Sequence, residues 1–347
     1  MPTTDVLREP MTGSCAWQGG VLSRSDDWIY RLSDAEIAEL DTAMRAGLAR
    51  GIPLLDVTRE DFPLPTLTPV LEQMTDELEN GRGFVLVKGL PADRYSEVQA
   101  SRMYWGLGQH LGMPVSQNAA GDLLGHVRDT GRSIRDPSVR GYQTKVRLPY
   151  HTDGSDVVGL LCFRPARSGG LSTIVSSSAV YNEVLRRRPD LVDRMYEPFY
   201  FDRREEHREG EDPFYATPLV TFYEGKLSMR YIRGFIESAQ RHAAVPRLTD
   251  QDIELFDLID QIANAEEFRL DMDFEVGDMQ FLNNYVIMHS RTNYEDFEEH
   301  AHKRHLLRLW LTLRQGRALP ESFARGSAST NGSGGRGGVP PRVPLNV

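Results

Sequence analysis

The residues His151-Thr152-Asp153 have the types and the spacing of a metal site. Residues i and i+2 of a β-strand point to the same face, so one imidazole and one carboxylate could bind the same ion. With 9 histidines and 50 acidic residues in 347, about one such His-x-acid match is expected by chance. A second match, His207-Arg208-Glu209, lies in a highly charged stretch and is interpreted as chance. The first match follows a strand-like run and precedes a turn at Gly154, which makes it the candidate.

A third ligand is offered far downstream by His289. It stands where a long apolar run, GDMQFLNNYVIM, gives way to polar residues. A single histidine beside an apolar strand is more often part of the core or its rim. Together with His151 and Asp153, however, it completes a set of two histidines and one carboxylate. Such a set leaves open positions on one side of Fe(II), as the joint binding of a chelating cosubstrate and dioxygen requires.

Two pairs of cations share strand parity near these ligands. Arg304 and Arg308 could point into one cavity, where a planar guanidinium can pair bidentately with a carboxylate. The alternative is that both are surface arginines on an edge strand. Lys145 and Arg147 share parity with His151, so both could bind an anionic group of the substrate. The alternative here is that the strand is irregular before His151 or that both side chains reach solvent.

The elements that must position these residues fall into two halves. The first half is helical: Ser33 and Glu36 form a capping box, and apolar residues follow at helical spacing up to Gly51. Further helices are expected over 67–81 and 101–111, with a buried strand at 84–87 between them. From about residue 140 strands predominate. We expect strands at 143–150, 157–163, 171–175, 219–223, 227–231, 268–274, 279–288 and 305–313, with helical inserts at 178–195 and 249–265.

This order predicts an α+β fold in which a β-sandwich or barrel is flanked by helices. We expect a flexible N-terminus over 1–15, a single domain over 16–325 and a disordered Gly/Ser/Pro tail over 326–347. The segment 203–212, RREEHREGED, is too charged for a core and is either a solvated loop or a mobile lid. Residues 300–305 contain three histidines, which could form a second metal site but fit a polar turn better.

Composition narrows the class of protein. A formal charge of −10 argues against nucleic acid or an anionic membrane as a partner, though a pocket could still be locally basic. No apolar run approaches the roughly 18 residues that a membrane span needs, and no secretion signal is evident. Cys15 and Cys162 do not suggest a disulfide framework, which fits a cytoplasmic protein. Self-association into a homo-oligomer is compatible with the sequence.

The sequence resembles the taurine dioxygenase-like family of Fe(II)/2-oxoglutarate oxygenases, which includes clavaminate synthase-like enzymes. The resemblance runs from about residue 83 to 313. It is carried by LPYHTDGS, GGLSTIVSS, GDMQFLNNYVIMHSRT and KRHLLRLWL in that order. It implies a double-stranded β-helix, also called a jelly-roll barrel, with the metal ligands at its open end.

The resemblance also implies roles for individual residues. His151, Asp153 and His289 would bind iron, and Thr173 would donate a hydrogen bond to 2-oxoglutarate. Arg304 would pair with the distal carboxylate of 2-oxoglutarate, while Arg308 would assist it or contact the substrate; the two arginine roles could also be exchanged.

The reaction implied is the oxidation of a small molecule by dioxygen, with succinate and carbon dioxide released from 2-oxoglutarate. Because Asp153 is present, hydroxylation, desaturation or ring formation is favoured over halogenation. One alternative is a metal-dependent isomerase or hydrolase on the same barrel, which would not need the two arginines. Another is a non-catalytic binding barrel, which the intact ligand set disfavours. The substrate cannot be read from the fold.

Overall fold

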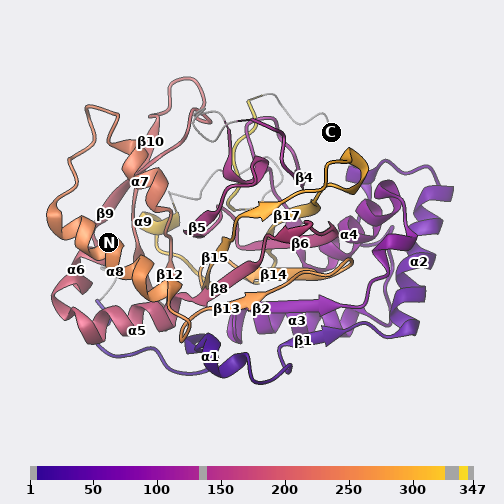
Figure 1. Cartoon of the computed structure of the whole chain (residues 1–347), viewed down its shortest axis with the longest axis horizontal. Coiled ribbons are helices and arrows are strands. Elements are labelled where there is room, and N and C mark those ends of the chain that lie inside the picture. The colour runs from indigo at the N-terminus through magenta and orange to yellow at the C-terminus, as the bar shows by residue number, and fades with distance from the viewer. Residues whose placement is uncertain (1–5, 133–138, 325–335, 343–347) are drawn as a thin grey trace.

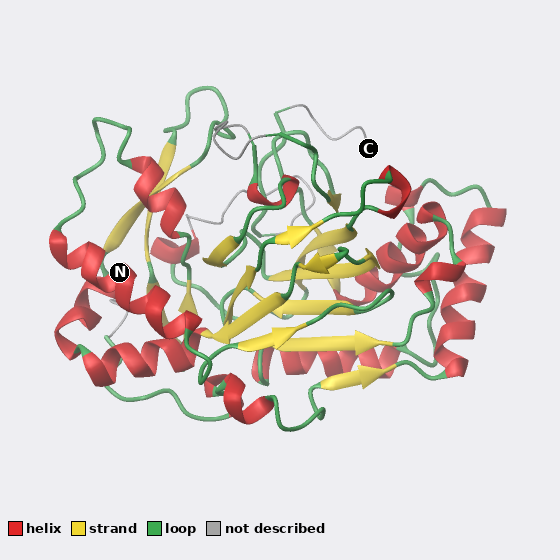
Figure 2. Cartoon of the chain, in the orientation of Figure 1, coloured by secondary structure: helices red, strands yellow, loops and turns green. Residues whose placement is uncertain are grey.

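The computed structural model describes residues 6–132, 139–324 and 336–342. Two β-sheets form the centre of the molecule, and helices lie at both ends (Figures 1 and 2). The larger sheet has the strand order β1-β2-β14-β6-β17-β3, and β4 also pairs with β17. Its strands are β1 (Ile29–Arg31), β2 (Phe84–Lys88), β3 (Gly112–Pro114), β4 (Leu124–Val127), β6 (Val157–Arg164), β14 (Met279–Asn283) and β17 (His305–Leu313).

The smaller sheet has the order β13-β8-β15-β5 and is antiparallel throughout. Its strands are β5 (Leu148–His151), β8 (Ser172–Ser176), β13 (Leu270–Met272) and β15 (Ile287–Arg291). Three two-stranded ribbons accompany the sheets. They pair β9 (Pro198–Asp202) with β10 (Phe214–Pro218), β11 (Val220–Tyr223) with β12 (Lys226–Met229), and β7 (Ser168–Gly169) with β16 (Tyr294–Glu295).

The helices cover opposite ends of the two sheets. In Figure 1, α2 and α4 lie at one end, and α5 to α8 lie at the other end with β9 and β10. The helices are α1 (Gly19–Leu22), α2 (Asp34–Ala49), α3 (Thr68–Asn80), α4 (Glu97–Leu111), α5 (Ser177–Arg187), α6 (Val192–Tyr196), α7 (Arg233–Ala239), α8 (Asp250–Asn264) and α9 (Glu321–Ala324). Within the described residues, no helix is both long and apolar enough to cross a membrane.

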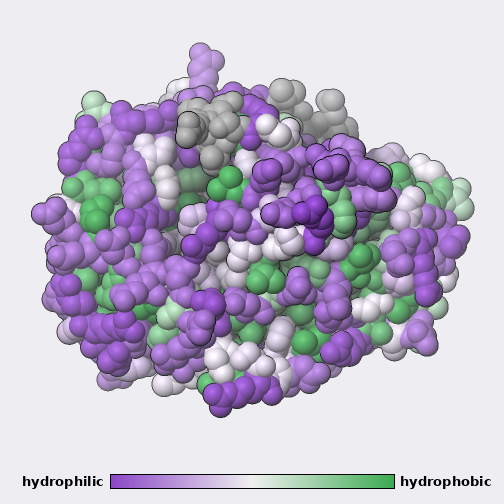
Figure 3. All heavy atoms as spheres, viewed as in Figure 1, coloured by the Kyte–Doolittle hydropathy of each residue, from purple (hydrophilic) through white to green (hydrophobic). Residues whose placement is uncertain are grey.

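Three cores hold these layers together. The core between the two sheets combines Val158 and Trp310 of the larger sheet with Ile174 and Ile287 of the smaller one. A second core packs α2, α3 and α4 against the outer face of the larger sheet, and a third packs α5, α6 and α8 around the ribbons β9 to β12. The surface seen in Figure 3 is mostly hydrophilic, with apolar residues in small separate groups.

Most of the expected elements are present, and the helix starts have a clear cause. The capping box of Ser33 and Glu36 is confirmed at α2. The helix expected from residue 101 begins earlier, at Glu97, because Ser96 and Gln99 form another capping box. Each box satisfies backbone N–H groups that the first turn of a helix leaves without partners.

The strand expected over 279–288 is wrong as a single element. It is two strands, β14 and β15, in different sheets, joined by a turn at residues 284–286. Two asparagines cause the break, since asparagine side chains readily bond to turn backbone. The Asn283 carboxamide oxygen accepts the N–H of Tyr285 at 3.0 Å, and the Asn284 side chain donates to the Ser155 carbonyl at 3.0 Å. His289 therefore lies inside β15 rather than at the end of one long strand.

The two chain ends that we expected to be loose lie only partly within the described residues. Residues 1–5, 325–335 and 343–347 lie outside the described residues. Of the N-terminal segment, Leu7 N–H donates to the Tyr196 hydroxyl at 3.2 Å, and Met11 N–H donates to Asn182 at 2.7 Å. Of the C-terminal segment, residues 336–342 run along the larger sheet and its neighbouring loops. Val339 N–H, for example, donates to the Ser116 carbonyl at 2.8 Å.

Candidate metal centre and active-site pocket

The two candidate histidines face each other across neighbouring strands. His151 of β5 is the direct register partner of His289 of β15, and their ring centroids are 4.2 Å apart. Asp153 follows β5 and reaches both rings. One carboxylate oxygen lies 3.8 Å from His151 Nε2, and the other lies 3.7 Å from His289 Nε2. The predicted meeting of these three side chains is confirmed, and their ligand atoms are close enough for one ion to contact all three.

Neighbouring groups hold His151 and Asp153 in place. His151 Nδ1 lies 2.8 Å from the Pro149 carbonyl, which can only accept, so Nδ1 carries the proton and Nε2 keeps its lone pair. Trp310 Nε1 donates to the Asp153 carboxylate at 3.1 Å. The Asp153 backbone N–H donates to the Asn284 side chain at 3.0 Å. His151 and Asp153 are thus oriented by hydrogen bonds that do not depend on a metal, whereas His289 Nδ1 has no hydrogen-bond partner among the described residues.

The protonation states fit a metal site. Burial lowers the pKa of His289 to about 3, and the adjacent His151 adds to this effect. Burial alone would raise the pKa of Asp153, but His289, Arg308 and His151 hold it below its usual value. A neutral imidazole and an ionised carboxylate are the forms that bind metal. Two imidazoles with one carboxylate suit Fe(II), so the residues present fit an iron ion.

The three side chains line a cavity of about 510 Å³. The even-numbered residues of β17 and the position before it contribute to the same wall: Arg304, Leu306, Arg308 and Trp310 all line the cavity. The strand parity expected for Arg304 and Arg308 is therefore confirmed. Further arginines come from loops and other strands. The arginines of the cavity wall, besides these two, are Arg140, Arg203, Arg204, Arg230, Arg233 and Arg291.

Arg304 is a buried cation on the cavity wall. It is 4% exposed, and its Nη1 has no hydrogen-bond partner among the described residues. Its guanidinium lies 5.0 Å from the Tyr294 ring centroid, and Arg291 lies over the same ring at 4.8 Å. Burial lowers the pKa of Arg304 from its ordinary value. An anion at this position would supply the missing partner.

Arg308, unlike Arg304, acts electrostatically on the candidate metal ligands. Its charge contributes to lowering the pKa values of both Asp153 and His289. Its Nε donates to Gln117 at 2.6 Å, and its guanidinium stacks 4.2 Å from the Tyr142 ring centroid. Gln117 is itself held by donating to the backbone carbonyl of Arg308 at 2.9 Å. Arg308 is therefore fixed in orientation while facing the cavity.

Thr173 is not brought to the cavity. It pairs with Ser290 across β8 and β15, whereas its neighbour Ser172 pairs with Arg291 and lines the cavity. Because side chains alternate along a strand, Ser172 shares the face of His289 and Thr173 takes the opposite one. Because Ser172 and Thr173 are adjacent and both carry a hydroxyl group, the sequence alone does not decide which of them faces the cavity.

Lys145 and Arg147 are not among the residues that line the cavity, so the strand parity with His151 that was expected for them is wrong. The regular strand is only Leu148–His151, and both cations are exposed in the irregular chain before it. The Arg147 guanidinium donates to Asn264 instead. The pairing of β5 with β15 also shifts register between His289 and Arg291, so strand parity cannot be extended back from His151.

The charged segment 203–212 joins β9 to β10 and touches the cavity. Arg203, Arg204 and Glu206 line it, and Glu206 forms an ion pair with Arg140 from a different loop. Burial, together with Arg204 and Arg308, lowers the pKa of Arg140 to about 10, so it remains a cation at neutral pH. The segment 203–212 is thus part of the cavity wall and is more than a solvated loop.

The histidines at 300–305 do not gather. His300 and His302 are exposed, whereas His305 is buried against His126, with Glu97 nearby. His126 Nδ1 lies 2.8 Å from His305 Nε2, and an Arg164 nitrogen lies 3.2 Å from His305 Nδ1. Because arginine only donates, Nδ1 of His305 accepts and Nε2 carries the proton given to His126. This chain of hydrogen bonds uses the lone pairs that a metal would need.

Several site residues were missed by sequence reasoning. The sequence did contain a signal that Trp310 and Arg291 face the cavity. Trp310 shares strand parity with Arg308, and Arg291 lies two residues after His289. Arg140 and Arg230 had no such signal, because they come from irregular segments whose placement depends on the whole fold.

The family of the chain follows from comparison with known proteins. Residues 49–310 match the model of the family described as "Taurine catabolism dioxygenase TauD, TfdA family". The chain belongs to this family of dioxygenases. A relative named "FR-33289 synthase", from Streptomyces rubellomurinus, is 32% identical over 92% of this chain and 95% of its own length. "Taurine hydroxylase-like protein SAT17", from Stachybotrys chartarum, is 30% identical over 87% of this chain and 80% of its own.

Solved structures with a similar fold include an asparagine oxygenase in complex with Fe(II), 3-hydroxyasparagine and succinate. It has a TM-score of 0.65 at 16% identity and covers 90% of this chain and 99% of that one. The non-haem iron oxygenase OrfP, solved with iron and α-ketoglutaric acid, has a TM-score of 0.60 at 17% identity and covers 82% and 94%. The TauD family member thus shares its fold with these non-haem iron oxygenases.

Proposed function

We propose that this TauD family member hydroxylates a small anionic molecule, with iron held by His151, Asp153 and His289. The domain over 16–325 is proposed to be a double-stranded β-helix. Two observations support this fold: the two sheets share one core, and the three ligands lie where β5 and β15 meet the cavity.

The chain's own residues define how the cosubstrate is bound. With Fe(II) bound by the three ligands, 2-oxoglutarate and dioxygen would be converted to succinate and carbon dioxide while one oxygen atom enters the substrate. Arg304 is assigned to the distal carboxylate of 2-oxoglutarate, because it is buried on the cavity wall without a carboxylate partner among the described residues. Ser172, rather than Thr173, is assigned as the hydroxyl on the same face.

The observation that carries the substrate class is the set of arginines around the cavity. Arg230 is 3% exposed, lines the cavity, and has no hydrogen-bond partner for its Nε among the described residues. Within the same described part, neither Arg230 nor Arg308 forms an ion pair with a carboxylate. Burying a cation without a counterion is costly unless a ligand supplies one. On a protein whose net charge is −10, this local excess of positive charge favours an anionic substrate.

The names of the relatives are compatible with this proposal. Taurine is a sulfonate, and one relative is named as taurine hydroxylase-like. The asparagine oxygenase of similar fold was solved with a hydroxylated amino acid, which is a zwitterion. An amino-acid-like substrate is therefore the second candidate. A metal-dependent isomerase or hydrolase finds no support in these comparisons.

A substrate panel tests the proposal. Carboxylates, sulfonates, phosphonates and amino acids are each incubated with Fe(II), 2-oxoglutarate and the protein, and stimulated succinate release is measured together with a product one oxygen atom heavier. Arg230→Gln should then weaken the apparent affinity for the active anion without changing that for 2-oxoglutarate. Arg147→Gln, which removes an exposed arginine outside the cavity, serves as the matched control. Turnover of neutral compounds only would contradict the proposed substrate class.

A further inference from the structure

The segment Arg336–Pro340, called the C-terminal strap here, lies against the metal centre although it is far from it in sequence. Gly338, Val339 and Pro340 line the same cavity as His151 and Asp153. We propose that the C-terminal strap positions the loop that carries Asp153 and forms the part of the pocket wall that selects the substrate. This inference rests on the function proposed above.

The C-terminal strap bonds directly to the loop 153–156, called the ligand loop here. Gly338 N–H donates to the Gly154 carbonyl at 2.7 Å, one residue after the carboxylate ligand. On the other side, Val339 N–H donates to the Ser116 carbonyl at 2.8 Å. The strap is therefore bonded to the ligand loop and to the chain after β3 at the same time.

The close approach explains a glycine in the strap. Gly337 has a φ of +83°, a conformation that side-chain-bearing residues rarely adopt. A Cβ atom there would lie 2.7 Å from the Gly154 carbonyl oxygen and 3.2 Å from the Ser155 Cα atom. Any larger residue would thus push the strap away from the ligand loop. The contact between the strap and the ligand loop therefore requires glycine at position 337.

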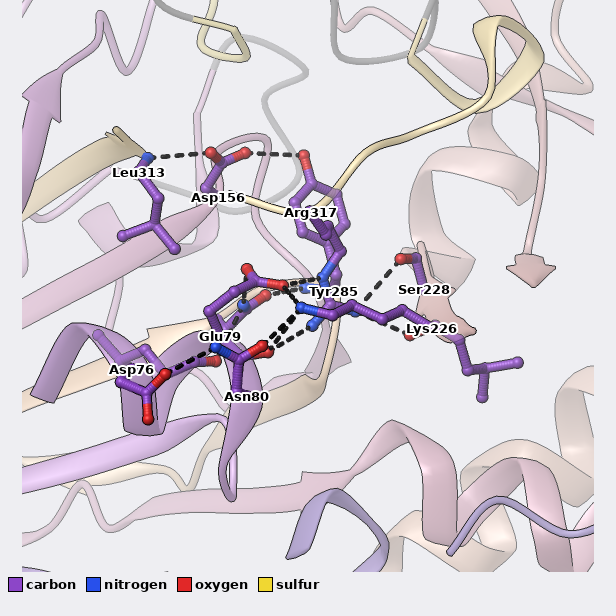
Figure 4. Close-up of polar contacts among 12 residues, drawn as sticks. Asp76, Glu79, Asn80, Asp156, Lys226, Ser228, Tyr285, Leu313 and Arg317 are labelled. Carbon is purple, nitrogen blue, oxygen red and sulfur yellow. Dashed lines mark hydrogen bonds and ion pairs between the residues drawn. The ribbon is translucent and has the colours of Figure 1, made fainter. Parts of the chain in front are cut away.

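Arg336 anchors the strap in a buried polar network. Its Nε donates to the Asp156 carboxylate at 2.8 Å, and its Nη1 lies within hydrogen-bond distance of the Arg317 carbonyl. Asp156 is fully buried and also accepts from the Tyr285 hydroxyl and the Leu313 N–H, both at 3.0 Å (Figure 4). Removing Arg336 would leave a buried carboxylate without its only cationic partner in the described part of the chain.

The network links Arg336 to the metal ligand through a short, rigid path. Asp156 ends the ligand loop that begins with Asp153. Its carbonyl accepts the Asn284 N–H at 2.9 Å, and the Asn284 side chain accepts the Asp153 N–H at 3.0 Å. Arg336 is therefore a positioning residue: it acts on Asp153 through Asp156 and Asn284, without touching the metal site.

Val339 gives the strap its second role. It packs against the core between the sheets, which includes Val158 and Trp310, and both of these also line the cavity. The side chain at 339 therefore forms part of the apolar boundary of the cavity. A larger residue there would narrow the space left for the substrate.

The positioning role is tested by metal affinity. Fe(II) is titrated anaerobically into Arg336→Ala, Arg336→Lys and the exposed control Arg342→Ala, and the melting temperature of each is recorded. We expect roughly tenfold weaker Fe(II) binding in Arg336→Ala, partial recovery in Arg336→Lys and no change in Arg342→Ala. A lower melting temperature with unchanged Fe(II) affinity would show a purely structural role and would overturn the inference. Fe(II) affinity can be measured even if the wild type makes no succinate, so the two proposals fail separately.

The selective role is tested with Val339→Trp and Val339→Ala, which remain informative if Arg336→Ala does not fold. The wild type's best anion from the substrate panel is the probe. Val339→Trp should lower its kcat/KM roughly tenfold or more, and Val339→Ala should accept bulkier anions that the wild type rejects. If the wild type is active and both variants retain its substrate profile, the strap is not part of the pocket wall.

Discussion

Trp310 shows how much of this site depends on residues that would never touch the iron. Its indole N–H donates to the Asp153 carboxylate, and its ring lies 5.2 Å from the Arg308 guanidinium. The same residue belongs to the core between the sheets. One side chain thus links sheet packing to the orientation of a ligand and of a cation in the pocket.

Replacing Trp310 by Phe keeps the ring in the core but removes the hydrogen bond to Asp153. We expect roughly tenfold weaker Fe(II) binding, as is usual when a group that orients a metal ligand is lost. Anaerobic titration of Fe(II) measures it. Trp105→Phe is the matched control, since its indole N–H donates to the Val57 carbonyl at 3.0 Å, away from the cavity. Equal Fe(II) affinities in the two variants would argue against a role for the Trp310 bond.

Arg304, which precedes β17, and Arg308 within β17 should differ in their kinetic effects. Arg304→Ala should raise the KM for 2-oxoglutarate at least tenfold, because a hydrogen bond to a charged group is worth about 1.5–3 kcal/mol. Arg308→Ala should act mainly on the KM for the substrate. Succinate release at varied 2-oxoglutarate measures the first KM, and succinate release at varied substrate measures the second. The reverse pattern would exchange the two assignments.

Residue types and spacing in the sequence were enough to predict that His151, Asp153 and His289 lie together, because each of them sits in a short local motif. They were enough to predict that Arg304 and Arg308 face the cavity, because side chains alternate from Arg304 along β17. They failed for Lys145 and Arg147, where the chain before His151 is not a strand. Parity predicts a side chain's direction only as far as the regular strand extends.

At the scale of elements, helices that begin with a capping box were predicted well, whereas the single helical insert expected at 178–195 is two helices, α5 and α6. Capping boxes and apolar spacing are local, so α2 agrees with its expected range to within a few residues. The split between β14 and β15 depends on which sheet each half joins, and an apolar run carries no such information. The positions of the arginines that loops contribute to the cavity also depend on non-local packing, so the sequence did not predict them.

The capping box of α2 makes a prediction about pH. Burial alone would raise the pKa of Glu36, but hydrogen bonds from Tyr30 and Ser33 lower it below the usual 4.5. Its charge therefore stabilises the fold above pH 4.5, and this contribution disappears as the pH falls through the lowered pKa. Glu36→Gln should reduce the free energy of unfolding at pH 7 by roughly 1 kcal/mol.

The check is urea denaturation of the wild type and Glu36→Gln at several pH values. The difference between them should shrink as the pH falls toward 3. Glu72→Gln, which changes an exposed carboxylate on α3, should show little difference at any pH. A Glu36→Gln deficit that stays constant with pH would mean that the charge is not responsible.

At the scale of the whole molecule, one acidic chain surrounds one basic pocket. The pocket wall draws on both sheets, the segment between β9 and β10, and the C-terminal strap. These parts are separated by long stretches of sequence, so the pocket exists only in the complete fold. This explains why the ligand motif could be recognised from the sequence while the arginines contributed by loops and the strap could not.

The most direct test of the account is iron-dependent succinate formation by His151→Ala and His289→Ala. Each variant removes one imidazole of the proposed set, and circular dichroism controls for folding. Arg147→Gln, which changes an exposed residue outside the cavity, serves as the control variant. The account predicts that the wild type and Arg147→Gln release succinate from 2-oxoglutarate only when Fe(II) is added, and that both histidine variants release none. Full succinate formation by either folded histidine variant would contradict the assignment of the metal centre.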